Sequence, residues 1–222
     1  MVFLHGYLSC KESFYHQINA LSKCGFKCIA PDFPAFGASD GLEEAWGVEE
    51  YADWFKTFLN CVGGERADII AHSFGARVIL YALSQDNSLC NRLIITGGAG
   101  LVKPRSPQYI RQVKKYRRLK KLFPKFAERH FGSEEYKSLS PLMKESYKKI
   151  VNRDLKAEAE RVNNHTLLIY GNDDTTTPPD EEGATFEKLM KNARLIKIKG
   201  DHFCFANYPE EFNSLVIEFL KE

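Results

Sequence analysis

Short apolar runs alternate with segments of helical periodicity along most of the chain. The apolar runs, each a candidate strand, are Val2–His5, Phe26–Asp32, Ala67–Ala71, Arg92–Thr96, Thr166–Tyr170 and Ala193–Lys199. The last run alternates apolar and polar residues, which is typical of an edge strand. Helical spacing covers Ser13–Cys24, Val48–Cys61, Phe74–Leu83 and Pro209–Leu220. Regular alternation of this kind predicts an α/β fold, with a mostly parallel sheet and helices on both faces.

Residues 101–161 depart from this alternation. They show helical patterns without a convincing strand, and they carry 18 basic and 7 acidic residues, a net charge of +11. The whole chain has a net charge of only +2, so the remainder carries −9. We therefore predict an acidic α/β core formed by residues 1–100 and 162–222, with a basic helical cap formed by residues 101–161. A chain of 222 residues is long enough for one well-buried domain of this kind.

The densest basic stretch of the cap is Arg111–Lys121. An anionic membrane surface, a nucleic acid or an acidic substrate could each recognise it. We interpret it as the solvated outer face of a lid, because it lacks a wide apolar stripe. The sequence therefore favours neither a nucleic-acid partner nor a membrane surface, and it leaves the oligomeric state open.

Other features bear on the cellular compartment. No apolar run approaches the length of a membrane span. The N-terminal residues lack the basic start of a signal peptide. The six cysteines form no C-x-x-C pair and no spacing that is typical of a metal site. These features predict a reduced, cytoplasmic protein with free thiols.

A serine stands where a predicted strand meets a predicted helix. Ser73 follows the apolar run Ala67–Ala71, and helical periodicity begins at the next residue. Helix capping alone would explain a serine there. However, Ala71 and Gly75, two positions before and after it, are small, as a very sharp turn requires. Such a turn would lift the serine oxygen clear of the sheet, where a substrate can reach it.

A serine hydroxyl needs a base to become a nucleophile, and the base needs an orienting acid. In parallel sheets, reactive groups gather after the carboxyl ends of strands. Asp173 and Asp174 follow the predicted strand Thr166–Tyr170, and His202 follows the last predicted strand. The chain order is thus serine, aspartate, histidine.

Four motifs in this order resemble the α/β-hydrolase fold superfamily over nearly the whole chain. They are LHGY near the start, AHSFGA at the turn, YGNDDTTTP after the late strand and GDHF before the last helix. The resemblance implies Ser73 as the nucleophile, His202 as the general base and then acid, and Asp174 as the orienting acid, with Asp173 as the competing choice. It also implies an oxyanion hole made by the backbone N–H groups of Tyr7 and Phe74.

The cap also fits this resemblance, since family members carry helical insertions after the sixth family strand. Residues 131–155 are similar to caps of small bacterial members. Two features depart from the family pattern. Ala71 stands where the family usually has glycine, and the chain begins at the strand before His5-Gly6, where the family usually has two or more earlier strands. Without those strands, Phe26–Asp32 would lie at a sheet edge.

The resemblance predicts a serine hydrolase that cleaves a small or medium carboxylic ester through an acyl-enzyme. The partner would be a small-molecule acyl substrate, and no cofactor or metal is expected. The alternatives are a carbon–carbon bond hydrolase or lyase acting on an anionic substrate, a slow-turnover ligand-binding homologue, and a membrane-surface lipase. The candidate pocket-lining aromatics of the cap are Tyr109, Tyr116, Phe123, Phe126 and Phe131. For His72 we expect packing near the site, and for His5 a role in bracing the oxyanion loop.

Overall fold

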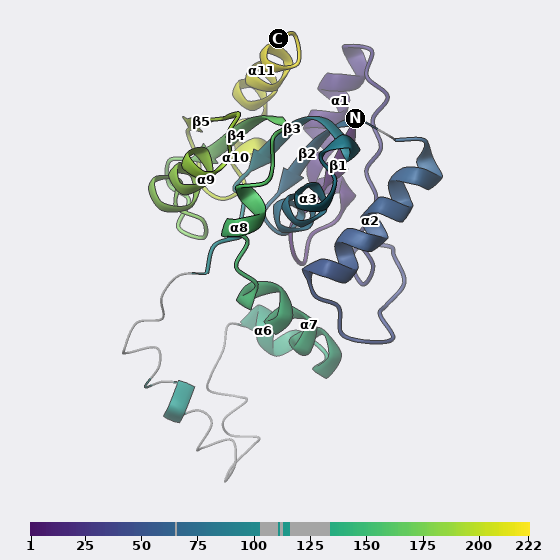
Figure 1. Ribbon diagram of the computed structural model, residues 1–222, viewed down its shortest axis with the longest axis vertical. Coiled ribbons are helices and arrows are strands. Elements are labelled where there is room, and N and C mark those ends of the chain that lie inside the picture. Colours follow the sequence, from purple (N-terminus) through teal and green to yellow (C-terminus); the bar gives the residue numbers. More distant parts are fainter. Residues whose placement is uncertain (65, 103–110, 112, 116–133) are drawn as a thin grey trace.

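A parallel sheet of five strands forms the centre of the molecule (Figure 1). The computed structural model describes residues 1–64, 66–102, 111, 113–115 and 134–222. The strands are β1 (Val2–Leu4), β2 (Ala67–His72), β3 (Cys90–Thr96), β4 (His165–Gly171) and β5 (Ala193–Ile198). They lie in the order β1-β2-β3-β4-β5, and each neighbouring pair is parallel. The predicted α/β class is confirmed, and β5 is an edge strand as expected.

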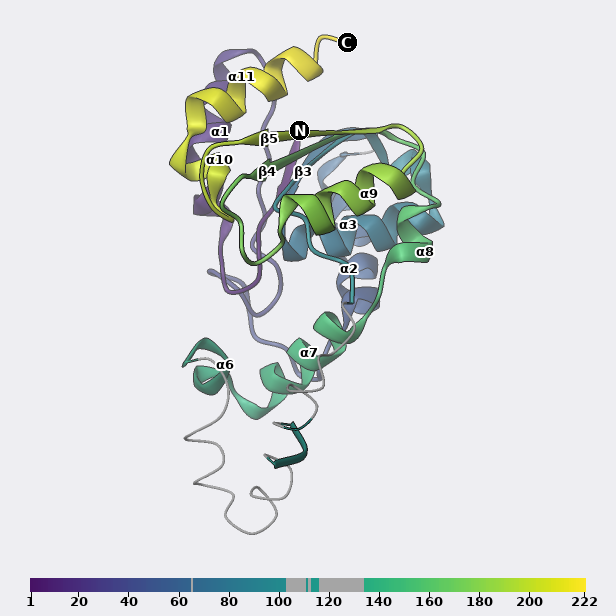
Figure 2. The same cartoon turned by 90° about the vertical axis from the view of Figure 1, so that its left-hand side faces the viewer.

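Helices cover both faces of the sheet (Figure 2). On one face lie α1 (Tyr15–Lys23), which follows the short η1 (Lys11–Phe14), α10 (Cys204–Asn207) and α11 (Pro209–Phe219). On the other lie α2 (Val48–Val62), α3 (Phe74–Gln85), α8 (Lys156–Ala159) and α9 (Ala184–Leu189). The short turns η2 (Asn87–Leu89) and η3 (Pro179–Gly183) precede β3 and α9. The predicted helices are thus present, with ends that differ by a few residues.

The sheet separates two hydrophobic cores. Alternate residues of β2 point to opposite faces, so Ile69 packs with the α2 and α3 side while Ile70 packs with the α1 and α11 side. β3 does the same with Leu93 and Ile94. Because both faces are covered, the central strands are apolar throughout, which explains why they read as continuous apolar runs in the sequence.

The prediction of a strand at Phe26–Asp32 is wrong. Only Ile29 makes a bridge to Val2 of β1, with one hydrogen bond donated to the Ile29 carbonyl by the Phe3 amide (2.9 Å) and one from the Ile29 amide to Met1 (2.9 Å). The Phe26 amide is already bonded to the end of α1, and Pro31 has no N–H to donate. The segment does lie at the edge beside β1, as expected.

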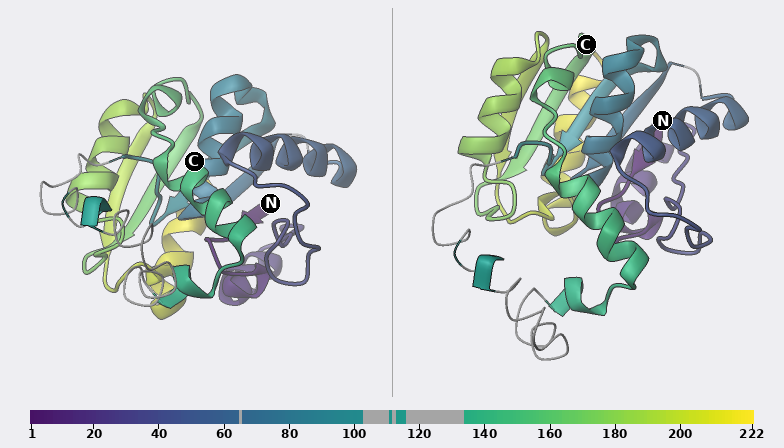
Figure 3. Two further views of the ribbon diagram at one scale, coloured as in Figure 1. Left: turned by 90° about the horizontal axis from the view of Figure 1, so that it is seen from below. Right: turned by 60° about the horizontal axis from the view of Figure 1, so that its bottom comes forward.

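The described part of residues 101–161 is helical beyond residue 133. It contains α6 (Glu134–Ser138), α7 (Pro141–Asn152) and α8. In the left view of Figure 3, α7, drawn in green, crosses in front of the sheet, and its Ile150 belongs to the hydrophobic core on the α2 and α3 side. Ser146 of α7 donates to the Trp46 carbonyl (2.5 Å), and Lys149 donates to the Ala45 carbonyl (2.6 Å). Most of the basic stretch and all five candidate cap aromatics lie outside the described residues, so the division into core and cap stays a prediction.

Candidate active site

Ser73 occupies a strained turn between β2 and α3. Its backbone φ is +49°, a left-handed conformation that costs a non-glycine residue free energy. Gly75 makes the turn possible, because a Cβ atom there would lie 2.4 Å from the carbonyl oxygen of Leu4. The sharp turn predicted from the small residues around Ser73 is therefore present. Phe74 follows as the first residue of α3, so its amide has no acceptor one turn earlier in the helix.

Asp174 and His202 form a hydrogen-bonded pair across two loops. The Asp174 loop follows β4 and the His202 loop follows β5, and Oδ2 of Asp174 lies 2.8 Å from Nδ1 of His202. Asp173, the competing choice, is exposed, whereas Asp174 is only 3% exposed. Of the two neighbouring carboxylates, Asp174 is the one bonded to the histidine.

Thr176 and Thr177 complete the surroundings of the Asp174 carboxylate. Its Oδ1 accepts the backbone N–H groups of Thr176 and Thr177, each at 2.8 Å, and its Oδ2 accepts the Thr177 hydroxyl at 2.8 Å. Burial would raise the pKa of Asp174, but the hydrogen bonds from His202 and Thr177 outweigh it and hold that pKa below its ordinary value. The carboxylate therefore stays charged beside His202. Sequence reasoning did not single out Thr177.

A pocket of about 710 Å³ lies over the carboxyl ends of the strands. The loops after all five strands contribute to it, including Tyr7 after β1, Ser73 after β2 and His202 after β5. Phe74 also lines it. Three α7 residues, among them Tyr147 and Ile150, line it from the side of the predicted cap. Ser73 and His202 thus line the same cavity as Tyr7 and Phe74, the two residues of the implied oxyanion hole. Asp174 lies behind His202.

Tyr7 joins the core to α7. Its ring packs against Phe74 (5.8 Å between ring centroids) and against Tyr147 (5.2 Å), and its hydroxyl donates to the Met143 carbonyl at 3.4 Å. Tyr7, whose backbone N–H is expected to form part of an oxyanion hole, thus has a side chain held from both sides of the pocket.

His72 and His5 are both buried around this site. His72 donates from Nε2 to the carbonyl oxygen of His202 (3.0 Å), so its Nδ1 carries no proton. Its ring lies 4.7 Å from the His202 ring, and burial together with the His202 charge lowers the pKa of His72 to about 3. His5 accepts the Phe33 amide (3.0 Å) on Nε2 and bonds the Gly6 carbonyl (2.7 Å) through Nδ1. His72 thus packs near the site as expected, and His5 ties the loop before Tyr7 to the core.

Two buried charged residues of the pocket were not found from the sequence. Arg77, one turn after Ser73 on α3, donates to the carbonyl oxygens of Ile150 (3.2 Å) and Arg153 (3.0 Å), where α7 ends. Glu182 accepts the backbone N–H groups of Gly100 and Leu101, each at 2.9 Å. The pair therefore fixes the chain on both sides of the predicted cap. Arg77 and Glu182 differ from surface charges only in being buried, and the sequence gives no signal of that burial.

Other potentially reactive groups are less suited to chemistry. Cys204 is buried, and burial raises the pKa of its thiol to about 11, so it is protonated at neutral pH. Within the described parts of the chain, no three histidine, cysteine or acidic side chains converge as a metal site would require. In the same parts, no helix combines the length and apolar character needed to cross a bilayer.

A parallel sheet with a strained serine between a strand and a helix, and with an aspartate–histidine pair after its last two strands, is the arrangement of α/β hydrolases. Comparison with known families agrees, because the family model described as the alpha/beta hydrolase fold matches residues 1–156. The chain belongs to the α/β-hydrolase family.

Individual relatives are diverse. The chain is 25% identical to the AB hydrolase superfamily protein YisY of Bacillus subtilis, over 99% of this chain and 90% of that protein. It is 26% identical to the 2-hydroxymuconate semialdehyde hydrolase of Pseudomonas putida, over 88% of this chain and 77% of that protein. Among solved structures, bromoperoxidase from Bacillus anthracis gives a TM-score of 0.81 at 19% identity, covering 100% of this chain and 91% of the other. The esterase of Exiguobacterium antarcticum gives 0.77 at 18% identity, with the same coverage.

Proposed function

We propose that the protein is a serine hydrolase that cleaves small or medium carboxylic esters. The observation that carries the proposal is the hydrogen bond between Asp174 and His202 beside a pocket that also contains Ser73, whose backbone is held in a strained conformation. Strain of this kind is retained where the surrounding structure over-determines it, and it is frequent at catalytic positions.

In the proposed reaction, the Ser73 hydroxyl attacks the carbonyl carbon of the ester while His202 takes its proton on Nε2. The backbone N–H groups of Tyr7 and Phe74 stabilise the oxyanion that forms. Collapse of the tetrahedral intermediate breaks the bond to the leaving alcohol, which receives the proton from His202. Water, deprotonated by His202, then attacks the acyl-enzyme and releases the acid. Asp174 keeps the proton of His202 on Nδ1 and stabilises the imidazolium.

His72 supports this mechanism electrostatically. When His202 becomes an imidazolium, a second positive charge in the neighbouring ring would oppose it. The low pKa of His72 keeps that ring neutral throughout the neutral pH range. The hydrogen bond from His72 to the His202 carbonyl also fixes the loop that carries the base.

The pocket has room for a small or medium acyl group. A volume of about 710 Å³ is ample for a small-molecule ligand. Its walls include the rings of Tyr7, Phe74 and Tyr147, with Ile150 and Leu101 beside them. We infer that these side chains receive the apolar part of the substrate, while the carbonyl carbon lies at Ser73.

Labelling with a fluorophosphonate probe tests the nucleophile. The wild-type protein should be labelled in a time-dependent manner, and Ser73→Ala should not be labelled. Ser22→Ala, an exposed serine on α1, is the matched control and should react like the wild type. Failure of the folded wild-type protein to react, or unchanged labelling of Ser73→Ala, would contradict the proposal.

A second candidate is hydrolysis of a carbon–carbon bond in an anionic substrate. It is supported by the similarity to 2-hydroxymuconate semialdehyde hydrolase and by the buried Arg77 in the pocket. A panel of p-nitrophenyl esters of increasing acyl length, compared with carboxylated dienol-ketone substrates, separates the two. Faster turnover of the dienol-ketones would favour this second candidate.

A further inference from the structure

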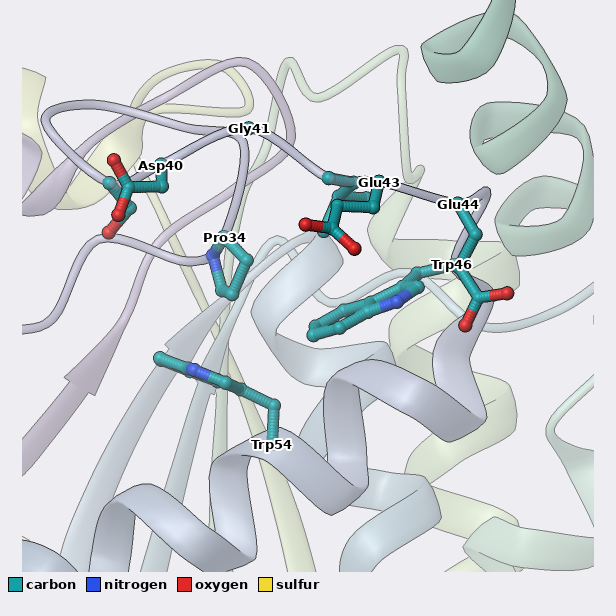
Figure 4. Close-up of a pocket in the computed structure, with 9 residues that line it drawn as sticks. Pro34, Asp40, Gly41, Glu43, Glu44, Trp46 and Trp54 are labelled. Carbon is teal, nitrogen blue, oxygen red and sulfur yellow. The ribbon is translucent and has the colours of Figure 1, made fainter.

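A second cavity lies away from the candidate active site. It has a volume of about 740 Å³ and shares no lining residue with the pocket around Ser73. We propose that it binds a small organic cation of the alkylated ammonium class. Two tryptophans and three carboxylates of its lining matter here, namely Trp46, Trp54, Asp40, Glu43 and Glu44 (Figure 4).

Two indole rings provide the apolar wall of the cavity. Trp54 projects from α2 and Trp46 from the loop before that helix, and both are half-buried. Each ring packs against a further aromatic side chain. Trp54 stacks on Phe58 with 5.5 Å between centroids and 15° between planes, and Trp46 packs edge-on against Tyr51 at 5.2 Å. Fixed tryptophan rings are the best aromatic partners for a cation, because the ring face carries partial negative charge.

Three carboxylates provide the negative charge. Asp40, Glu43 and Glu44 are exposed, and the cavity lining contains no lysine, arginine or histidine. In the described ranges of the chain, none of the three makes an ion pair with a basic side chain. Figure 4 shows the Glu43 carboxylate next to the Trp46 indole, with the Asp40 and Glu44 carboxylates to either side of the two rings.

The arrangement of the carboxylates suits an organic cation better than a metal ion. A metal needs several oxygen ligands converging on one point, and among the described residues no such cluster exists. A cation of larger radius instead combines dispersed negative charge with aromatic contact, which is how quaternary ammonium groups are recognised.

The cavity is pre-organised, which lowers the entropy cost of binding. The Ala35 amide donates to the Asp40 carbonyl at 2.7 Å and closes the loop on itself. The hydrogen bonds from Ser146 and Lys149 of α7 then fix the part of the loop around Trp46.

The chain offers a direct reporter for this test. It contains only two tryptophans, and both line the cavity, so intrinsic tryptophan fluorescence reports on this site alone. The wild-type protein is titrated with choline and, separately, with 3,3-dimethylbutan-1-ol, which has the same shape without the charge. We expect a saturable change with choline and an affinity for the neutral alcohol that is weaker by on the order of tenfold.

Variants locate the binding. Glu43→Gln combined with Glu44→Gln removes charge from exposed positions without changing shape, and it should weaken choline binding severalfold while the fold is retained. Trp54→Leu should abolish binding, measured by calorimetry because one reporter is lost. Ser73→Ala is the matched control and should bind choline like the wild type, which separates this proposal from that of the serine hydrolase.

Three results would overturn the proposal. The first is no saturable signal with choline, and the second is an equal response to choline and its neutral analogue. The third is unchanged choline affinity in the Glu43→Gln, Glu44→Gln variant. Calcium chloride is titrated in parallel, and tighter binding of calcium than of choline would replace the organic cation by a metal ion.

Discussion

Replacing Asp174 by asparagine tests the proposed catalytic roles most sharply. The carboxylate accepts four hydrogen bonds, two on each oxygen. In Asp174→Asn the remaining oxygen can keep both backbone N–H groups of Thr176 and Thr177. The new NH2 group then faces the Thr177 hydroxyl, which can rotate to accept, and Nδ1 of His202, which must also accept. The proton of His202 therefore moves to Nε2, where it blocks transfer from Ser73.

The two consequences of this substitution differ in size. Loss of the correct tautomer and of the negative charge should lower kcat/KM by roughly 10³- to 10⁴-fold, which corresponds to about 4–5.5 kcal/mol of transition-state stabilisation. Folding should lose only about 1–3 kcal/mol, since the four hydrogen bonds of the carboxylate become hydrogen bonds of a neutral amide and no donor need stay unpaired. The assays are ester hydrolysis and fluorophosphonate labelling for the chemistry, and urea unfolding for stability.

Asp173→Asn is the matched control. It makes the same chemical change one residue earlier, at an exposed carboxylate, and should change activity by less than about twofold. Activity of Asp174→Asn within about tenfold of the wild type, or an equal loss in Asp173→Asn, would contradict the role proposed for Asp174.

Three further substitutions test the supports of the site. Gly75→Ala would push a methyl group to 2.4 Å from the Leu4 carbonyl, so urea unfolding should detect a loss of about 1–3 kcal/mol; an unchanged midpoint would contradict the close approach. Arg77→Met leaves two carbonyls at the end of α7 without their donor, so the free energy of unfolding should fall by about 1–3 kcal/mol. Arg77→Lys should be intermediate, and equal stability of the three proteins would contradict a stabilising role of the two hydrogen bonds from Arg77. Burial opposes ionisation of Asp32, but hydrogen bonds from two backbone amides and from Lys11 outweigh it and lower its pKa to about 2. Because this pKa is lowered in the folded state, its contribution is present above about pH 4 and is lost as the pH falls toward 2, so the melting temperature of Asp32→Asn should depend less on pH across that window than that of the wild type.

The sheet was predictable because its strands are buried on both faces. Short continuous apolar runs such as Ile69–Ala71 and Leu93–Ile95, separated by helical segments, are typical of buried parallel strands. The failure at Phe26–Asp32 has the opposite cause. The composition of that segment is that of a strand, but Pro31 has no N–H and the Phe26 amide is bonded to the end of α1. Ile29 therefore forms the bridge to β1, and beside it only the Lys27 carbonyl bonds the N-terminal amine. Local composition does not reveal which backbone groups are already occupied.

The positions of Ser73, Asp174 and His202 were predictable for a related reason. Each follows the end of a strand, so finding the strands also finds the residues that meet at one edge of the sheet. The choice between Asp173 and Asp174 was not decided by strand ends, because both residues follow the same strand. It depends on which carboxylate turns inward, and the backbone amides of Thr176 and Thr177 bond only the inward one.

Substrate selectivity lies beyond this kind of prediction. Part of the pocket wall comes from Tyr147 and Ile150 of α7, which reach the pocket through contacts with residues far away in the sequence. The role of Arg77 could not be predicted either. Its guanidinium bonds the end of α7, and the sequence does not show that α7 ends beside it. Chemistry in this family depends on short motifs at fixed places in the sheet, whereas the pocket depends on how an inserted segment packs over them. Substitutions at Tyr147 and Ile150 should therefore change the preferred acyl length without affecting the rate of fluorophosphonate labelling with a small probe.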